Sequence, residues 1–364
     1  MVAHPAVFGP ITNVEAGALV RSGLVATRRL DVGLVVRVED THPWGAVMGA
    51  FPGESALSSV LRQVERAHLR PDPTAVREAL SRADRLVQEL HFGPAWMFRV
   101  VNVHPHGSLS RGTGIKDFND LDRLVELDPV ALRTREDGER TAADTIQRMK
   151  ACIEGRRGGL VSMGMIQVRA QDHSVGVTYP AKGLHIDLVP AVRRRGRLMI
   201  PERDTGEWLQ ADPAGTAARL KRAKAVAPHA GVVIRLLKGW ARARGHNAPI
   251  GSFAIETLVV NAMLERPSAL DEAICTFFHV FADAHAGRHL LLGGADEPEG
   301  AVTLIEPLSG NNLTSKLSGA QRKALVDTCR TALLSLGEID ALTRRGKESQ
   351  AQTAARRLFV PTRT

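Results

Sequence analysis

Two aspartates separated by one residue open a segment whose pattern is typical of a β-strand. Asp120 and Asp122 begin this run, which extends to Leu127. Because side chains along a strand alternate between its two faces, both carboxylates must project from the same side. Two carboxylates so close together repel each other unless a cation lies between them. The pair therefore predicts a strand with one chemically active face.

A third aspartate, Asp187, lies far downstream in the apolar, strand-like run 183–192. Burying a lone carboxylate is costly, so this residue needs a partner in the fold. On a neighbouring strand it would complete, with Asp120 and Asp122, a set of hard oxygen ligands for two Mg²⁺ ions, with Mn²⁺ able to substitute. Such ions can activate a hydroxyl and stabilise a leaving pyrophosphate. The three aspartates are thus the expected metal ligands and catalytic residues.

A glycine–serine turn precedes the aspartate pair. Gly107 and Ser108 follow an apolar, strand-like run over residues 97–103. Glycine lets backbone N–H groups approach phosphate oxygens closely, and the serine hydroxyl adds a donor. The alternative is that Ser108 only caps a turn or a short helix. The turn and the carboxylates together indicate transfer of a nucleotidyl group.

The periodicity divides the chain into three regions. Residues 1–55 show no sustained period and predict no function. Residues 56–200 combine amphipathic helices with strand-like runs, which predicts a mixed sheet covered by helices. Residues 201–364 contain mainly helical patterns, so the expected fold is α+β, with a mixed-sheet lobe, a helical lobe and a nucleotide cleft between them. The expected strands are 97–103, 120–127, 159–168, 174–179 and 183–192, and the expected late helices are 213–227, 229–245, 251–265, 269–286 and 318–336.

The net charge and the cysteines indicate which partners and which cellular compartment to expect. The formal net charge is +9, which favours polyanionic partners such as nucleoside triphosphates or RNA. Solvated faces of an arginine-rich protein are the alternative. The three cysteines show no metal-binding spacing, and the chain has no secretory signal and no apolar run of roughly 18 residues. We therefore expect a cytoplasmic protein with no membrane interaction.

The order of these motifs resembles that of the DNA polymerase β-like nucleotidyltransferase superfamily. Within it, the chain is most similar to the bacterial cGAS/DncV-like nucleotidyltransferases (CD-NTases), which are related to the 2′-5′-oligoadenylate synthetases. Their Gly-Ser-x-x-Arg-Gly-Thr turn and Asp-x-Asp strand match residues 107–113 and 120–122. Their third metal ligand lies in a strand that ends in proline, matched by residues 186–190. The resemblance implies a two-lobed fold in which the mixed sheet is the palm lobe.

The helical region carries further matches to the family. Residues 233–240 resemble the helix whose lysine, here Lys238, binds the donor triphosphate. Residues 250–258 resemble the start of the next helix, where a serine contacts phosphate and a neighbouring aromatic ring stacks on the donor base. The resemblance implies these roles for Ser252 and Phe253. Residues 207–213 and 306–312 resemble the family's Trp-x-x-x-Asp-Pro and Asp-Pro…Asn-Asn segments.

Each of these residues also has an ordinary structural interpretation. Lys238 could extend to solvent from an amphipathic helix. Ser252 is well suited to cap its helix, and Phe253 could pack in a core. His104 and His106 flank the glycine–serine turn, and with no other clustered ligand they are expected to be surface or loop residues.

Two positions depart from the family pattern. Arg123 follows Asp122 where the family usually has an apolar residue. We expect it to point to the opposite face of the strand and to pair with a surface carboxylate. Glu306 stands where the family has an aspartate in its late motif.

The resemblance implies a metal-dependent nucleotidyltransferase that joins nucleoside triphosphates into a cyclic or linear oligonucleotide second messenger in antiphage defence. Asp187 would also draw the proton from the attacking hydroxyl. A separate effector protein would respond to the product, and a regulatory partner or RNA would control activity. Two alternatives share the site: a template-independent RNA tailing enzyme of the CCA-adding or poly(A) type, and a catalytically decayed nucleotide-binding partner. The intact carboxylates disfavour the last.

Overall fold

The computed structural model describes residues 55–91, 99–116, 120–132, 141–282 and 304–362. All of them belong to the larger of the two units into which the chain divides, Val35–Thr364. The extension predicted over residues 1–55 therefore lies outside the described residues, apart from Ser55. The hydroxyl of Ser55 caps the first described helix, α1 (Ala56–Val64), by accepting a hydrogen bond from the backbone N–H of Ser58.

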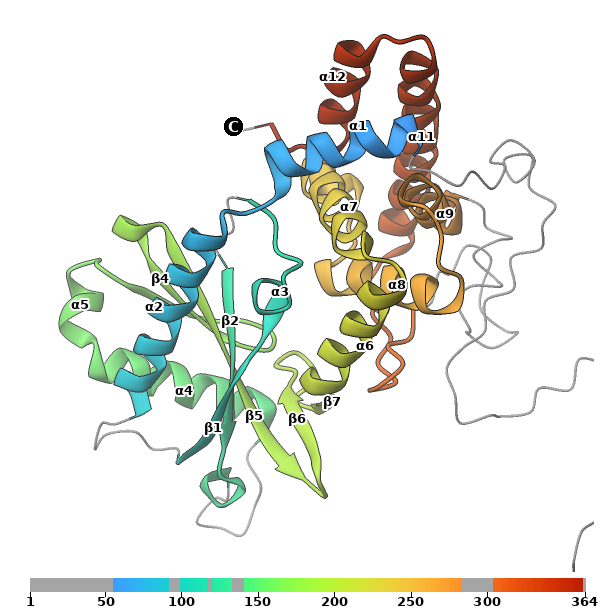
Figure 1. Cartoon of the computed structure of the whole chain (residues 1–364). Helices are drawn as coiled ribbons and strands as arrows, with labels where there is room; N and C mark the ends of the chain where they lie inside the picture. The colour runs from blue at the N-terminus through green and yellow to red at the C-terminus, as the bar shows by residue number, and fades with distance from the viewer. Residues whose placement is uncertain (1–54, 92–98, 117–119, 133–140, 283–303, 363–364) are drawn as a thin grey trace, which may run out of the picture. The chain divides into compact units, whose positions relative to one another are not determined.

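A mixed β-sheet forms the first part of the described chain (Figure 1). The strand order is β1-β2-β5-β4-β3. In addition, β6 pairs with β5, and β7 pairs with β6. β2 and β5 run parallel, whereas the other neighbouring strands are antiparallel. The sheet agrees with the predicted mixed α+β class. The strands are β1 (Val100–Pro105), β2 (Asp120–Leu127), β3 (Gln167–Ala170), β4 (Val175–Tyr179), β5 (Leu184–Arg194), β6 (Arg197–Pro201) and β7 (Trp208–Ala211).

Helices cover one face of this sheet. α2 (Pro73–His91) contacts β2, and α4 (Ala142–Arg156) contacts the strands from β3 to β6. Leu121 and Val125 of β2 are buried in the core on this face. Asp122 lies between them in the sequence, so the alternation of the strand directs it to the other face.

Arg123 is the charged exception in the buried row of β2. Its side chain is 3% exposed, and its guanidinium donates to Asp84 Oδ1 on α2 at 2.7 Å and to the carbonyl of Leu80 at 3.0 Å. Asp84 is 55% exposed. The prediction that Arg123 points away from the aspartate face and pairs with a surface carboxylate is confirmed.

The second part of the described chain is helical, and aromatic side chains build its core. Trp240 packs edge-on against Phe277 and Phe278, with ring centroids 6.1 Å and 4.9 Å apart. In the part of the chain that the structure describes, no helix is both long and apolar enough to cross a membrane. The helices of this part are α6 (Pro213–Val226), α7 (Ala230–Arg244), α8 (Ser252–Glu265), α9 (Leu270–Ala282), α11 (Gly319–Arg344) and α12 (Glu348–Phe359).

α1 joins the helical core, although its position in the sequence predicts that it belongs to the sheet lobe. Its buried Leu57 and Leu61 belong to the same apolar cluster as Trp240, and the helix contacts α9, α11 and α12. The hydroxyls of Ser55 and Ser58 donate to Asp271 at 2.7 Å and 2.9 Å. An amphipathic pattern predicts that a helix has an apolar face, but it does not say which core receives that face. The division near residue 201 stays a prediction.

One expected strand is wrong. Residues 159–168 contain the helix α5 (Gly158–Ser162) and only the start of β3. A short apolar run of this kind does not separate helix from strand by periodicity alone. The remaining short elements are the π-helix η3 (Glu65–Leu69), the helix α3 (Gly107–Ser110) and the 3-10 helices η4 (Pro129–Leu132), η5 (Pro180–Lys182) and η6 (Gly245–Asn247).

Candidate active site

The register of two parallel strands brings the predicted aspartates together. Asp122 on β2 is the direct partner of Asp187 on β5, and Asp120 is the partner of His185. Neighbouring strands lie about 4.8 Å apart, and side chains in register on parallel strands point to the same face. Asp122 and Asp187 therefore form a carboxylate pair on the face that α2 and α4 leave uncovered. The backbone of Asp120 belongs to the same row, and its side chain lies outside the described residues.

The glycine–serine turn touches this carboxylate pair. Gly107 has φ +77° and begins the short helix α3. A Cβ at Gly107 would lie 1.7 Å from Asp122 Oδ2, so no other residue fits there without moving the carboxylate. The positive φ also favours glycine. The backbone at Gly107 thus lies directly against Asp122, and Ser108 follows at the next position.

The donor set fits a hard divalent cation. Carboxylate oxygens are the ligands that Mg²⁺ and Mn²⁺ prefer in proteins, and the Asp122–Asp187 pair supplies them from two rigid strands. Among the residues that the structure describes, no three His, Cys, Asp or Glu side chains come close enough to hold a metal by themselves. The sequence predicts Asp120 as the third ligand, and this stays a prediction.

Lys238 is buried rather than extended to solvent. Its side chain is 3% exposed, and its ammonium donates to the carbonyl of Thr113 at 3.3 Å and to Glu256 Oε2 at 3.3 Å. Burial lowers the pKa of Lys238, and the negative charge of Glu256 opposes that shift. The alternative of a solvent-exposed lysine is therefore wrong. The structure places Lys238 against the end of the glycine–serine turn.

Four residues form a buried polar cluster around Glu256, which we call the Glu256 hub: Arg111, Thr113, Lys238 and Glu256. Arg111 Nε donates to Glu256 Oε1, and the Thr113 hydroxyl donates to Glu256 Oε2 at 2.6 Å. Burial by itself would raise the pKa of Glu256, but the charges of Arg111 and Lys238 outweigh it and the pKa is lowered. The hub ties the turn after α3 to helices α7 and α8.

The first turn of α8 carries the other two predicted nucleotide contacts. Gly251 occupies the N-cap position and Ser252 is the first helical residue, so the capping role considered for Ser252 is wrong. Phe253 is 38% exposed, and the guanidinium of Arg111 lies 5.9 Å from its ring centroid. Phe253 is therefore not a core residue. Both side chains are exposed at a helix end that the Glu256 hub holds to the turn.

The two histidines that flank the turn differ in their surroundings. His104 lies in β1, and its Nε2 is 2.7 Å from Glu126 Oε2, so it is a strand residue and not a loop residue. His106 immediately precedes Gly107. Burial and the charge of Arg111 lower the pKa of His106 to about 4, so its ring is neutral at pH 7.

His185 lies beside the carboxylate pair, and the sequence pattern does not predict a role for it. His185 Nε2 is 3.0 Å from Asp187 Oδ1, and His185 Nδ1 is 2.7 Å from the hydroxyl of Thr178. The only available signal was the spacing of two residues between His185 and Asp187, which places both on one face of a strand. Glu256 also had no predicted role, and it stands out in the sequence only as the one charged residue in the otherwise uncharged run 252–264.

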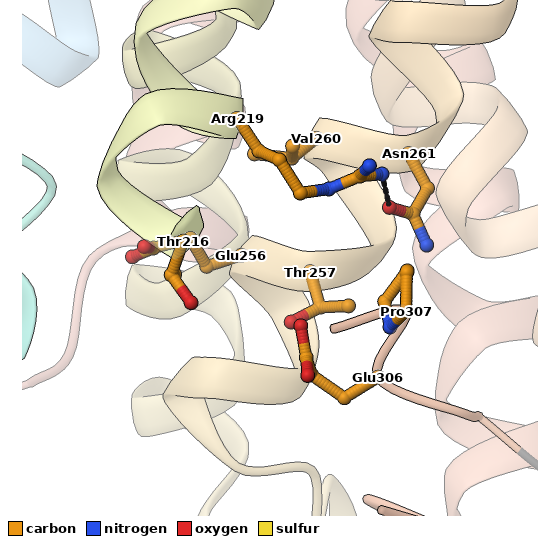
Figure 2. Close-up of a pocket in the computed structure, with 8 residues that line it drawn as sticks. All are labelled: Thr216, Arg219, Glu256, Thr257, Val260, Asn261, Glu306 and Pro307. Carbon is orange, nitrogen blue, oxygen red and sulfur yellow. Dashed lines mark hydrogen bonds between the residues drawn. The ribbon is translucent and has the colours of Figure 1, made fainter. Parts of the chain in front are cut away.

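Two hollows lie in the described part of the chain, apart from the carboxylate pair. Figure 2 shows the first, between α6, α8 and the Glu306–Pro307 segment, where Arg219 donates to Asn261 at 2.7 Å. Its volume is about 10 Å³, which holds about one water molecule. Glu306 itself accepts hydrogen bonds from the backbone of Leu308 and Ser309, so it closes a turn.

The second hollow has a volume of about 260 Å³ and lies between β1, the β5–β6 hairpin, β7 and the start of α6. His104, Arg193 and Gln210 are among its lining residues. Arg193 donates to Glu126 at 2.9 Å, which offsets its charge. Nothing in this lining matches the residues predicted to bind nucleotide.

Comparison with known proteins is consistent with this geometry. Residues 59–223 match the model of the Second Messenger Oligonucleotide or Dinucleotide Synthetase (SMODS) domain. The chain is 28% identical over 257 residues to the Cyclic AMP-AMP-AMP synthase of Escherichia coli (strain MS 115-1). That match covers 65% of this chain and 75% of the E. coli protein.

Solved structures share the fold. CdnC of E. coli MS115-1 with ATP has a TM-score of 0.64 and 20% identity, and the match covers 83% of this chain and 96% of that chain. Its complex with HORMA-deltaN gives a TM-score of 0.62 with the same identity and coverage. The CD-NTase CdnG of Bradyrhizobium diazoefficiens, in complex with GTP, has a TM-score of 0.56 and 16% identity, with 85% and 97% covered. The predicted two-lobed, polymerase β-like fold is confirmed, and the proteins to which this chain is similar are CD-NTases, which are nucleotidyltransferases.

Proposed function

We propose that this chain joins nucleoside triphosphates into a cyclic or linear oligonucleotide that serves as a second messenger in antiphage defence, in the cytoplasm. The observation that carries the proposal is the register that pairs Asp122 with Asp187 directly beside Gly107. CD-NTase homologues synthesise cyclic oligonucleotides, and the relatives solved with ATP or GTP support nucleoside triphosphates as substrates.

The carboxylates would hold two Mg²⁺ ions, with Mn²⁺ able to replace them. Asp120, Asp122 and Asp187 are the proposed ligands. When bound, the ions supply positive charge that stabilises the attacking oxygen and the departing pyrophosphate. Asp187 also accepts the proton of the attacking hydroxyl, whose oxygen forms a bond to the α-phosphorus as the bond to pyrophosphate breaks.

The remaining residues bind and orient the donor nucleotide. Ser108 and Ser252 would donate hydrogen bonds to the phosphates, and the exposed ring of Phe253 offers a surface on which a base can stack. Lys238 is buried, so its proposed role is to orient the turn. It holds the carbonyl of Thr113 and so fixes the end of the turn that approaches the triphosphate.

Two further partners belong to the proposal. The complex of E. coli CdnC with HORMA-deltaN supports a protein regulator for this chain as well. The product would act on a separate effector protein, as the family resemblance implies.

The decisive experiment incubates the full chain with the four labelled nucleoside triphosphates and Mg²⁺ or Mn²⁺, with and without added RNA. Phosphatase treatment and chromatography follow. We expect phosphatase-resistant products from nucleoside triphosphates alone, and none from the Asp122→Asn or Asp187→Asn variants. Growth of RNA 3′ ends as the sole activity would identify a tailing enzyme instead, and absence of pyrophosphate under every condition would indicate a decayed site.

A further inference from the structure

A hydrogen-bonded row of three side chains ends at one of the proposed metal ligands. Thr178 on β4 lies directly across from His185 on β5, and its hydroxyl is 2.7 Å from His185 Nδ1. His185 Nε2 is in turn 3.0 Å from Asp187 Oδ1. The side chains of His185 and Asp187 are 20% and 18% exposed, so solvent competes little for these hydrogen bonds.

The chemistry of the three groups sets the direction of the row. An ionised carboxylate only accepts hydrogen bonds, so the short contact to Asp187 requires a proton on His185 Nε2. In the neutral ring Nδ1 then carries a lone pair and accepts from the Thr178 hydroxyl. The Thr178 hydroxyl, which can donate, is compatible with the ring tautomer in which His185 donates to Asp187, and the side-chain amide of Gln171 also lies 3.3 Å from His185 Nε2.

Among the described residues, the hydrogen bonds to Asp187 all reach one of its two oxygens, Oδ1. Besides His185, the hydroxyl of Ser174 lies 3.5 Å from the same Oδ1, a distance at the limit of a hydrogen bond. Within the described part of the chain, the structure gives Oδ2 no hydrogen bond or ion pair. The row thus orients the carboxylate with one oxygen held by protein and the other left for a ligand.

A glycine makes room for the imidazole. Gly176 on β4 is the direct partner of Asp187. A Cβ at this position would lie 2.7 Å from His185 Cε1 and 2.8 Å from Gln171 Nε2. Gly176 is not among the glycines with positive φ, so its backbone does not demand glycine. Glycine is required at this position because the imidazole of His185 occupies the space that a side chain would fill.

We propose that His185 is a positioning residue that fixes the carboxylate of Asp187 for cation binding and proton acceptance, and that Thr178 and Gly176 hold His185 in place. The proposal rests on the function proposed above. Mutation of a residue that hydrogen-bonds to a metal ligand, without binding the metal itself, typically lowers metal affinity or activity by about 10- to 100-fold. His185 would act through Asp187 without touching the nucleotide.

The test compares the full chain with His185→Ala, His185→Gln and Thr178→Val. Pyrophosphate release gives kcat and KM, and a Mn²⁺ binding titration gives a readout independent of turnover. We expect His185→Ala to lower kcat and Mn²⁺ affinity by about 10- to 100-fold, with KM for nucleotide changed by less than about twofold because no ground-state contact is lost. His185→Gln, which keeps an N–H donor, should recover most of both.

Thr178 provides an internal check. Thr178→Val should cause a smaller loss in the same direction, and Thr178→Ser should cause none. Combining Thr178→Val with His185→Ala should add nothing to the loss from His185→Ala, because Thr178 acts only through the imidazole. His173→Gln is the matched control: its Nδ1 bonds to the carbonyl of Pro201 at 2.8 Å, outside this row, and wild-type kinetics are expected.

The outcomes separate this proposal from the function on which it rests. Wild-type kcat and Mn²⁺ affinity in His185→Ala, with both lost in Asp187→Asn, would overturn the role of His185 and leave the proposed function intact. A second outcome is that His185→Ala binds Mn²⁺ more weakly than the wild type, while the wild type itself forms no oligonucleotide. That outcome would support the positioning role of His185 and overturn the proposed function. Equal loss of Tm in His185→Ala and His185→Gln, with unchanged Mn²⁺ affinity, would show a packing role and overturn the proposal.

Discussion

At the scale of single residues, Glu256 is the buried carboxylate that Arg111, Thr113 and Lys238 all contact. Its side chain is 2% exposed, and that of Lys238 is 3% exposed. A buried ion pair gains little over apolar packing, but removing one partner leaves an uncompensated charge and is strongly destabilising. The hub is therefore a point at which a small chemical change has a large effect on folding.

Glu256→Gln is expected to lower the free energy of unfolding by about 3–5 kcal/mol, because Arg111 and Lys238 then face a neutral amide. Chemical denaturation measures this change. Adding Lys238→Met removes one of the two uncompensated cations and should restore part of the loss. Equal stability of Glu256→Gln and the wild type would show that the two cations have other compensation.

The Glu256 contribution should also depend on pH. The pKa of Glu256 is lowered from its ordinary value of 4.5, so the unfolded chain binds this proton more readily than the folded chain. The stabilisation is therefore present above pH 4.5 and is lost as the pH falls through the lower pKa of the folded state. The difference in unfolding free energy between wild type and Glu256→Gln should shrink below pH 4.5. A difference that stays constant down to pH 3 would contradict this assignment.

Asp122→Asn should separate folding from catalysis. Removing one of two neighbouring negative charges relieves repulsion in the metal-free protein, so its Tm should stay the same or rise. The increase in Tm that Mg²⁺ and nucleotide give the wild type should disappear, together with pyrophosphate release. Thermal unfolding with and without Mg²⁺ plus ATP measures the first effect, and retained turnover would rule out the proposed ligand role.

At the scale of elements, the sequence predicts β2 and β5 well. The spacing of Asp120 and Asp122 defines the faces of β2, and a carboxylate in an apolar run marks β5. Their register could not be predicted, because alternation in each strand is compatible with any shift by two residues. The packing of both strands decides that Asp122 meets Asp187.

Contacts between distant elements were also beyond the sequence. The partners of Glu256 come from a turn and from another helix, and only the folded chain brings Arg111 and Lys238 to the same carboxylate. α1 shows the same limit: its apolar face is visible in the sequence, but its place in the helical core is not. The short α5 was missed because its apolar run fits either type of element.

α1 offers a direct test of element packing. Leu61 is fully buried in the helical core, whereas Leu334 on α11 is 78% exposed. Leu61→Ala should lower the free energy of unfolding by about 2–5 kcal/mol, and the matched control Leu334→Ala should change it by less than about 0.5 kcal/mol. Equal effects in denaturant titrations would mean that α1 does not pack in this core in solution.

At the scale of the whole molecule, the positive charge bears on the choice between a messenger synthase and an RNA tailing enzyme. The net charge of +9 suits any polyanion. A nucleotide acceptor presents few phosphates, whereas an RNA stem is held through many. A protein that contacts several phosphates of a nucleic acid loses about a thousandfold or more in affinity between about 50 and 200 mM salt.

Product formation should therefore depend only weakly on salt. We expect KM for nucleoside triphosphates to change by less than about tenfold over that salt range, since few counterions are released. Initial rates at increasing KCl, with and without added RNA, provide the measurement. A steep decline that appears only in the presence of RNA would favour the tailing enzyme.

The contact between Gly107 and Asp122 also restricts how this chain can vary. The two positions are fifteen residues apart in the sequence, but they compete for the same volume. A side chain can enter at 107 only if the one at 122 shrinks, and that exchange removes a carboxylate. A deep mutational scan would therefore find glycine at 107 required wherever aspartate is kept at 122. In distantly related proteins with this fold, absence of the glycine would indicate that the carboxylate pair has also been lost.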